Sequence, residues 1–384
     1  MGTASTPGAV TVTPVYWIPS GTDPSLLSAQ YRNLVNNFGV NLSLDSGKPT
    51  NSFAVLGQYA GVTNQNGASQ TPRLLRYRIH AGSPLIDSSA FPADGCNVDP
   101  GSIYADNSGY SRCLTDTQLS DELRAVVRGA ALPVDSAHLY ALFTPEGLEV
   151  CSDGFNSMCT PSNTPNASGL CAYHSNFQGS STPNTLIYSV DPYPVWDSAT
   201  GYACNGSDQF PLGNPAADVS ISSYAHEIAE AITDPYGTAW IDTTGSEIGD
   251  LCAFNYGSLL STAAGAAVSQ RINGTGYYIQ GEFSNATFGL DPNRGCLSSW
   301  SLPVAHISSP PTLRIGKLST LVSHSLSASS PIVSQVWSID GRKLSFSAAW
   351  TRWFWTPGMR AVTLTVTDAA GYKSSVTRLI NVTN

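Results

Sequence analysis

The stretch Ser222-Ser-Tyr-Ala-His-Glu-Ile-Ala-Glu-Ala-Ile-Thr-Asp-Pro235 sets His226 and Glu230 four residues apart, with Glu227 between them. On an α-helix a step of four residues brings two side chains to one face, about 40° apart, while Glu227 stands about 100° round from His226. One helical turn therefore presents an imidazole, a carboxylate and a neighbouring base. This is the layout of a metal site carried by a helix.

The helix that carries this motif has recognisable ends in the sequence. Asp218 and Ser222 are candidate N-cap residues, because short polar side chains accept hydrogen bonds from the first free N–H groups of a helix. Asp234 and Pro235 end the helix, since the residue before a proline avoids helical geometry. The sequence therefore predicts a short helix of about three turns at residues 219–232.

The spacing is similar to the zinc peptidase signature His-Glu-x-x-His, in which both histidines bind the ion and the glutamate is the general base. Here Glu230 stands where the second histidine would be. Zinc accepts carboxylate oxygen, but a second anionic ligand lets harder, oxygen-preferring metals compete. We expect zinc, with His226 and Glu230 as ligands and Glu227 as the catalytic base. The same spacing also suits an ordinary amphipathic helix that packs through Ile228 and Ile232.

A third metal ligand is expected a short loop downstream. The segment Gly245-Ser-Glu-Ile-Gly-Asp-Leu-Cys252 offers the carboxylates of Glu247 and Asp250. Either side chain fits the place, and either also suits a surface acid that caps the next element. The sequence leaves the choice between them open.

These residues resemble the EXORDIUM or phosphate-induced-protein-like family of secreted proteins. The specific part of the likeness is Ala-His-Glu-Ile-Ala-Glu-Ala-Ile-Thr-Asp-Pro at 225–235, Ala-Trp at 239–240 and Glu-Ile-Gly-Asp-Leu-Cys at 247–252. Weaker likeness extends over residues 8–298. The resemblance implies a secreted protein that is extracellular or associated with cell walls. It leaves catalysis open, because some members lack the His-Glu-x-x-Glu residues, all of which this chain has.

His174 enters the candidate site through this resemblance. It lies in Cys171-Ala-Tyr-His174, which is similar to a Cys-Gly-x-His element of the family. A histidine beside the metal would serve as the third ligand or as a catalytic donor to the oxyanion of a tetrahedral intermediate. The alternative is a histidine in a surface loop.

Composition excludes some classes of partner. The chain of 384 residues has 18 Lys and Arg against 27 Asp and Glu, a formal charge of −9, and only 12% charged residues. No basic cluster accompanies the aromatic residues, so binding to nucleic acid or to an anionic membrane is not expected. No apolar run approaches the roughly 20 residues of a membrane span, and the first residues contain no apolar core of a leader peptide.

The eight cysteines predict disulfides and an extracellular location. All lie in the first 300 residues, at Cys96, Cys113, Cys151, Cys159, Cys171, Cys204, Cys252 and Cys296. None forms the Cys-x-x-Cys pair of a structural zinc ribbon, and an even count suits four disulfides. The pairing stays open, although Cys252 with Cys296 would close the segment around the candidate site.

Hydrophobic periodicity predicts strands at residues 10–17, 137–144 and 186–190, and helices at residues 25–38 and 116–131. Strands that alternate with helices indicate an α+β domain or a three-layer α/β domain with a mixed sheet. The active helix would pack on that sheet. We therefore expect a metallopeptidase-like, disulfide-bearing domain at residues 1–300.

The composition changes near residue 300, where Pro303 and Pro310-Pro311 suggest a linker. Strand patterns follow at 332–339, 361–367 and 375–382, without cysteine. This part resembles a small all-β, immunoglobulin-like sandwich of the polycystic-kidney-disease (PKD) type at residues 301–384. The aromatic run at 350–355 suits either the core of this sandwich or an exposed patch that binds cell-wall polysaccharide or a surface protein.

The sequence supports three hypotheses about function. The first is a secreted zinc peptidase that acts on protein or peptide substrates. The second is a non-catalytic extracellular or cell-wall interaction protein, in which a metal such as calcium only holds the fold. The third is a carbohydrate-active enzyme with Glu227 and Glu247 as paired carboxylates, which needs no metal.

Overall fold

The computed structural model describes residues 9–61, 73–96, 110–152, 158–161, 169–177, 185–197, 201–204, 209–261, 266–288, 295–299, 303, 305–310, 312–325, 332–368 and 373–384. Its helices are α1 (Ala29–Leu44), α2 (Asp116–Gly129), α3 (Pro215–Thr233) and α4 (Asn285–Phe288). Three 3₁₀ turns accompany them: η1 (Pro24–Leu27), η2 (Ser52–Gln58) and η4 (Asp250–Cys252). In these residues no helix is both long enough and apolar enough to cross a membrane.

A mixed sheet forms the centre of the larger part of the chain. Its strands run in the order β4 (Ile79–Ala81), β1 (Val10–Trp17), β7 (His138–Phe143), β10 (Ile187–Asp191) and β9 (Tyr173–Asn176), and β5 (Leu85–Asp87) also pairs with β1. The pairs are parallel except for β9, which lies antiparallel to β10 at the edge. The predicted mixed sheet is therefore confirmed.

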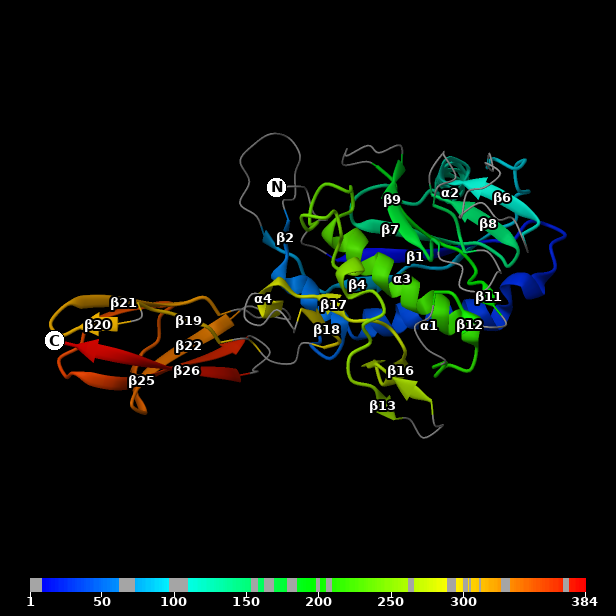
Figure 1. The fold of residues 1–384 in the computed structure, drawn as a ribbon. Helices are drawn as coiled ribbons and strands as arrows, with labels where there is room; N and C mark the ends of the chain where they lie inside the picture. Colours follow the sequence, from blue (N-terminus) through cyan, green and yellow to red (C-terminus); the bar gives the residue numbers. More distant parts are fainter. Residues whose placement is uncertain are drawn as a thin grey trace.

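Helices cover both faces of this sheet, as Figure 1 shows. Along β1, Val12 and Tyr16 point into a core shared with α1 and α3, while Val15 and Trp17 point into a second core shared with α2. The alternation follows from the two-residue period of a strand. Strands buried on both faces read as nearly continuous apolar runs, which is why β1, β7 and β10 are recognisable in the sequence.

Helix α3 is longer than the sequence predicts and begins earlier. Its N-cap is Asn214, whose side-chain oxygen accepts a hydrogen bond from the Ala217 N–H at 3.1 Å. Pro215 occupies the first turn, where its missing N–H has no cost. The expected caps were wrong: the Asp218 carboxylate instead accepts from the Leu212 N–H, and Ser222 lies buried within the helix. The predicted end at Asp234 is confirmed.

Helix α1 also differs from the expectation of one helix at 25–38. Ser28 divides the segment, because its side chain caps α1 by accepting from the Tyr31 N–H, and η1 precedes it. The helix then continues to Leu44. Helix α2 fits the prediction, except that it ends at Gly129 instead of residue 131.

Four disulfides form, as the even cysteine count predicts. They join Cys96 to Cys113, Cys151 to Cys159, Cys171 to Cys204 and Cys252 to Cys296. The last one ties η4 to a short strand, at a sequence separation of 44 residues.

Short two-stranded sheets accompany the central sheet. They pair β2 (Ala60–Gly61) with β3 (Arg73–Leu74), β6 (Arg112–Thr115) with β8 (Leu148–Cys151), β11 (Trp196–Asp197) with β12 (Gly201–Tyr202), β13 (Leu260–Ser261) with β14 (Ala267–Val268), β15 (Gln270–Ile272) with β16 (Thr275–Tyr277), and β17 (Glu282–Phe283) with β18 (Cys296–Leu297).

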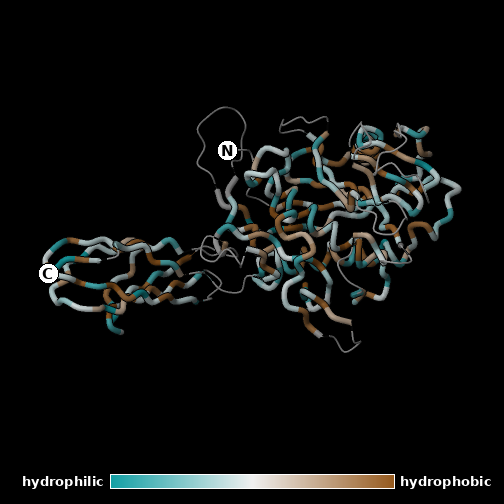
Figure 2. Tube along the Cα trace, viewed as in Figure 1, coloured by the Kyte–Doolittle hydropathy of each residue, from teal (hydrophilic) through white to brown (hydrophobic). Residues whose placement is uncertain are grey.

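The C-terminal strands form two sheets around a core of their own. One sheet holds β19 (Ile307–Ser308), β21 (Leu318–Ser323) and β24 (Ala349–Trp353), and the other holds β20 (Thr312–Arg314), β26 (Lys373–Thr383), β25 (Gly358–Asp368), β22 (Ile332–Ile339) and β23 (Arg342–Ser345). Hydrophobic and hydrophilic residues alternate along these strands (Figure 2). The boundary at residue 300 stays a prediction, since residues 300–302 lie outside the described residues.

The aromatic run of this part divides between core and surface. Trp350 and Phe354 are buried in the shared core with Trp337, whereas Trp353 and Trp355 are exposed. The run therefore contributes to both the core and the surface, because alternate residues of a strand face opposite sides. Binding through the exposed residues stays a prediction.

Asn214→Ala is expected to destabilise the protein by about 1 kcal/mol, because the substitution leaves the Ala217 N–H without its acceptor. Urea unfolding followed by circular dichroism measures this change. Asn214→Ser is the matched control and should retain nearly all of the stability, since serine is an equally good cap. Equal unfolding midpoints for Asn214→Ala and the parent protein would contradict this account of where α3 begins.

Candidate metal centre

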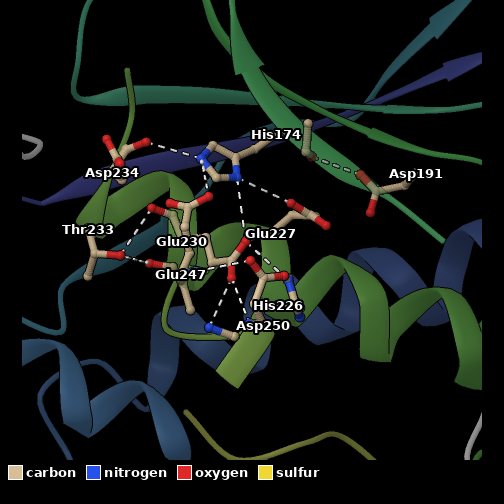
Figure 3. A network of polar contacts seen from close by, with 12 residues as sticks. His174, Asp191, His226, Glu227, Glu230, Thr233, Asp234, Glu247 and Asp250 are labelled. Atoms are coloured by element: carbon tan, nitrogen blue, oxygen red, sulfur yellow. Dashed lines mark hydrogen bonds and ion pairs between the residues drawn. The ribbon is translucent and has the colours of Figure 1, made fainter. Parts of the chain in front are cut away.

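The candidate site forms where α3 passes beneath the edge of the central sheet. Helix α3 presents His226, Glu227 and Glu230 within its last two turns, and β9 places His174 above them (Figure 3). The loop before η4 and the first residue of η4 bring the remaining two candidates, Glu247 and Asp250, to the same place. All six residues singled out in the sequence are thus neighbours in space, although they come from three separate segments.

His226 is held by both edges of its ring. Its Nε2 lies 3.1 Å from Glu230 Oε2 and 3.6 Å from Asp250 Oδ1. On the opposite edge, the Gln280 amide nitrogen lies 3.0 Å from His226 Nδ1 and donates to the Gly249 carbonyl oxygen at 2.8 Å. The ring therefore turns its Nε2 towards the two carboxylates.

Glu230 connects α3 to the downstream loop. Its Oε1 accepts hydrogen bonds from the Gly249 and Asp250 N–H groups, both at 2.9 Å, and its Oε2 faces His226. The close approach requires glycine at 249, because a Cβ there would lie 2.8 Å from the His226 ring and 2.9 Å from Glu230 Oε1. The carboxylate is thereby fixed in position, with one oxygen left for another partner.

His174 is engaged by acceptors at both nitrogens. Nε2 donates to the carbonyl oxygen of Asp234 at 3.1 Å, and Nδ1 lies 3.3 Å from Glu227 Oε2. Burial of the imidazole works to lower its pKa, but the hydrogen bond to Glu227 and the charges of Glu247, Glu227 and Glu230 outweigh it and raise the pKa to about 10. His174 is therefore a buried imidazolium that positions Glu227.

The two downstream acids occupy different places. Asp250 lies beside His226, whose hydrogen bond lowers the pKa of the Asp250 carboxyl. Glu247 lies on the other side, with Oε2 at 3.7 Å from His174 Nε2, and burial raises its pKa to about 8. Of these two acids, Asp250 is the one that accompanies His226 and Glu230.

Acidic groups outnumber the histidines around this site, and the sequence did not predict two of these acids, Asp191 and Glu282. Asp191 is buried at the end of β10, and its pKa is raised well above the ordinary value by burial and by the charge of Glu227. Glu282 is buried on β17 and neither carboxylate oxygen has a hydrogen-bond partner. Asp191 was detectable, because it directly follows a predicted strand whose end faces the motif helix. Gln280 and Glu282 carry no such signal.

The donor set is compatible with a small divalent cation. His226, Glu230 and Asp250 each offer one ligand atom that lies within 4.8 Å of those of the other two. Ligand atoms about 2.0–2.2 Å from a tetrahedral zinc ion lie roughly 3.4 Å apart, close to the 3.1 and 3.6 Å separations from His226 Nε2. His174, Glu227 and Glu230 form a second group of the same extent. The first group is the better candidate for an accessible metal, because His226 and Asp250 also line a cavity, whereas His174 is not among the described lining residues.

A cavity of about 420 Å³ opens beside the site. His226, Glu227 and Asp250 contribute to its lining, whereas His174 is not among the described lining residues. Glu227 is 4% exposed, and burial raises its pKa, although the hydrogen bond from His174 acts in the opposite direction. A carboxylate with a raised pKa next to a cavity is a suitable proton acceptor.

Comparison with known proteins finds no matching family model and no matching curated protein. Among solved structures, carbohydrate-binding modules from the β-sandwich superfamily match with 30% identity and a TM-score of 0.21, over 22% of this chain and 35% of the other. The PKD1 domain of the Vibrio cholerae metalloprotease PrtV matches with 30% identity and a TM-score of 0.20, over 22% of this chain and 99% of that domain. The PKD1 domain of Vibrio anguillarum Epp matches with 26% identity and a TM-score of 0.20, over 21% and 94%.

These matches each span about a fifth of the chain, and the first spans about a third of the structure it resembles. Solved structures similar to part of this chain thus include PKD domains. The likeness to the EXORDIUM family and the metallopeptidase-like character of residues 1–300 stay predictions.

Asp191→Asn is expected to stabilise the protein by a margin that grows as the pH rises. The folded-state pKa of Asp191 is raised above its unfolded value, so the stability present below the unfolded pKa is lost as the pH rises towards the folded pKa. Asparagine does not titrate and keeps an oxygen that can accept from the Ser189 hydroxyl, which bonds Asp191 at 2.8 Å.

Urea unfolding at several values between about pH 4 and about pH 8 tests this expectation. Asp121→Asn, at an exposed acid of α2, is the control and should give a small, nearly constant difference. A stability difference for Asp191→Asn that does not change with pH would show that the buried carboxyl does not titrate abnormally.

Proposed function

We propose that this chain is a secreted, zinc-dependent peptidase. The observation that carries the proposal is the convergence of His226, Glu230 and Asp250, each with a ligand atom within 4.8 Å of the others, beside a cavity that Glu227 also lines. Four disulfides support an oxidising, extracellular setting. On this proposal the fold of residues 1–300 is that of a metallopeptidase-like domain.

His226, Glu230 and Asp250 would hold the zinc ion. Zinc supplies Lewis-acid chemistry, which favours attack of water on a peptide carbonyl. Hydrogen bonds from the Gly249 and Asp250 N–H groups keep the Glu230 carboxylate in place, and Gln280 keeps His226 in place. Such outer contacts orient metal ligands and tune their affinity.

Glu227 would act as the general base. It accepts a proton from the attacking water and then passes that proton to the leaving amine. Burial favours its protonated form and makes it a stronger base, whereas the His174 imidazolium at 3.3 Å keeps it ionised. His174 is therefore a positioning residue on this proposal, because it contacts Glu227 and is not among the described residues that line the cavity.

A second candidate function is a non-catalytic extracellular or cell-wall interaction protein with a structural metal. The excess of carboxylates favours it, because calcium prefers oxygen ligands and Glu227, Glu230, Glu247 and Asp250 are all close together. The exposed Trp353 and Trp355 of the C-terminal sandwich would then contact cell-wall polysaccharide or a surface protein. The metal that copurifies with the protein separates the two candidates.

Metal analysis of the purified chain is expected to find close to one zinc per protein. His226→Ala should lose most of this zinc, because it removes the nitrogen ligand. His80→Ala, at an exposed histidine on β4, is the matched control and should retain the metal. Calcium in place of zinc, or zinc that stays bound in His226→Ala, would favour the second candidate function, in which a metal only holds the fold.

Glu227→Gln is expected to lower peptide cleavage by about 10²-fold or more while zinc stays bound, because glutamine keeps the shape of the side chain but accepts no proton. Cleavage of a denatured protein substrate, followed by mass spectrometry, measures the loss, and metal analysis of the same sample shows that the site is intact. Glu146→Gln, at an exposed acid, serves as the control. Full activity in Glu227→Gln would exclude Glu227 as the base.

A further inference from the structure

The cavity beside the candidate centre has both polar and apolar lining residues. Helix α3 contributes Ser222, Ser223, His226 and Glu227. The apolar lining residues, which we term the apolar end, lie on three other segments: Met158, Leu170, Ala172, Ala253, Phe254 and Tyr256. No Lys or Arg is among the described residues that line the cavity. The cavity therefore combines the reacting groups with a set of uncharged, apolar side chains.

Disulfides fix two of the three segments that form the apolar end. Cys171, between Leu170 and Ala172, is bonded to Cys204, and both cysteines line the cavity. Cys252, just before Ala253, is bonded to Cys296. The Tyr256 ring also stacks on Tyr278, with ring centroids 4.0 Å apart. The apolar end is thus a preformed surface, which reduces the entropy lost when a ligand is bound.

Phe254, which lines the cavity, has an unfavourable backbone conformation and an exposed apolar ring. Its backbone has φ of 58°, in the left-handed region that few residues other than glycine adopt. Its side chain is 54% exposed, although it is a large apolar group. Neither the backbone conformation nor the exposure is favourable for folding, so a ligand that covers the ring would recover part of the cost.

We infer that the apolar end of this cavity receives an aromatic or large aliphatic side chain of a peptide substrate, and that Phe254 determines this specificity. The inference rests on the proposed function for the identity of the substrate as a peptide. A volume of about 420 Å³ accommodates a side chain together with adjoining backbone. Ser222, Ser223 and Gln280 offer hydrogen-bonding groups for that backbone near Glu227.

A basic side chain is the competing occupant, because Glu227 and Asp250 also line the cavity. Both carboxylates are already engaged: Glu227 Oε2 faces His174, and Asp250 Oδ1 faces His226. Asp250 Oδ2 accepts from the Glu247 N–H at 3.0 Å. Because both carboxylates are engaged, the apolar lining residues favour an apolar side chain over a basic one.

The test uses capped peptides of the form Gly-Gly-Gly-Xaa-Gly-Gly, in which Xaa is Phe, Leu, Ala, Asp or Lys. Binding to the full chain in the presence of zinc is measured by isothermal titration calorimetry on the Glu227→Gln background, so that cleavage does not interfere. We expect the Phe and Leu peptides to bind roughly tenfold or more tightly than the Ala peptide, since the buried side chain supplies the difference. Asp and Lys should give no gain over Ala.

Phe254→Gly, made on the same background, is expected to lower the affinity for the Phe peptide by roughly tenfold and to leave that for the Ala peptide unchanged. Glycine suits the φ of 58°, so the change removes the ring without straining the backbone. Phe254→Asn is the second variant, because asparagine also tolerates this region. Leu259→Ala, at an exposed leucine not among the described lining residues, is the matched control and should behave like its parent.

Equal affinity for all five peptides, a preference for Lys, or an equal effect of Phe254→Gly on every peptide would overturn the inference. Cleavage of the same peptides by the wild-type chain distinguishes it from the proposed function. Selective binding without cleavage would retain the apolar subsite and remove the peptidase assignment. Cleavage without selectivity would do the reverse.

Discussion

The burial of acidic side chains on α3 is the constraint on which the structure around the site depends. Glu227 and Glu230 are 4% and 3% exposed, and a buried carboxylate without compensation is costly. Each has therefore acquired a partner from another segment: the His174 imidazolium for Glu227, and the N–H groups of Gly249 and Asp250 for Glu230. The position of β9, the path of the loop before η4 and the glycine at 249 all follow from this requirement.

Much of the central domain was predictable because its signals are local. The apolar runs of β1, β7 and β10, the period of α2 and the end of α3 at Asp234 were all read from neighbouring residues, and the structure agrees. The beginnings of α1 and α3 were not. Several polar residues precede each helix, and the sequence does not show which of them will cap it, since Asp218 is used instead to hold Leu212.

The candidate site was predictable as a set of residue types and only partly as an arrangement. A spacing of four residues fixes His226 and Glu230 relative to each other, because a helix has a known period. No local rule decides whether Glu247 or Asp250 turns to His226; that choice depends on the loop geometry set by Glu230 and Gly249. Gln280 and Glu282 come from a segment with no motif, so their proximity arises from tertiary packing alone.

The disulfide from Cys252 to Cys296 closes the segment around the site late in the synthesis of the chain. His174 and Glu227 are 53 residues apart in sequence, and His226 and Gln280 are 54 apart. During synthesis from the N-terminus, α3 therefore emerges before Gly249 and Asp250, which bind Glu230, and well before Gln280, which contacts His226. The bond that closes the loop needs a further 16 residues, from 280 to 296, and an oxidising compartment. Covalent closure of this cluster thus depends on the redox environment, and a chain held under reducing conditions lacks it.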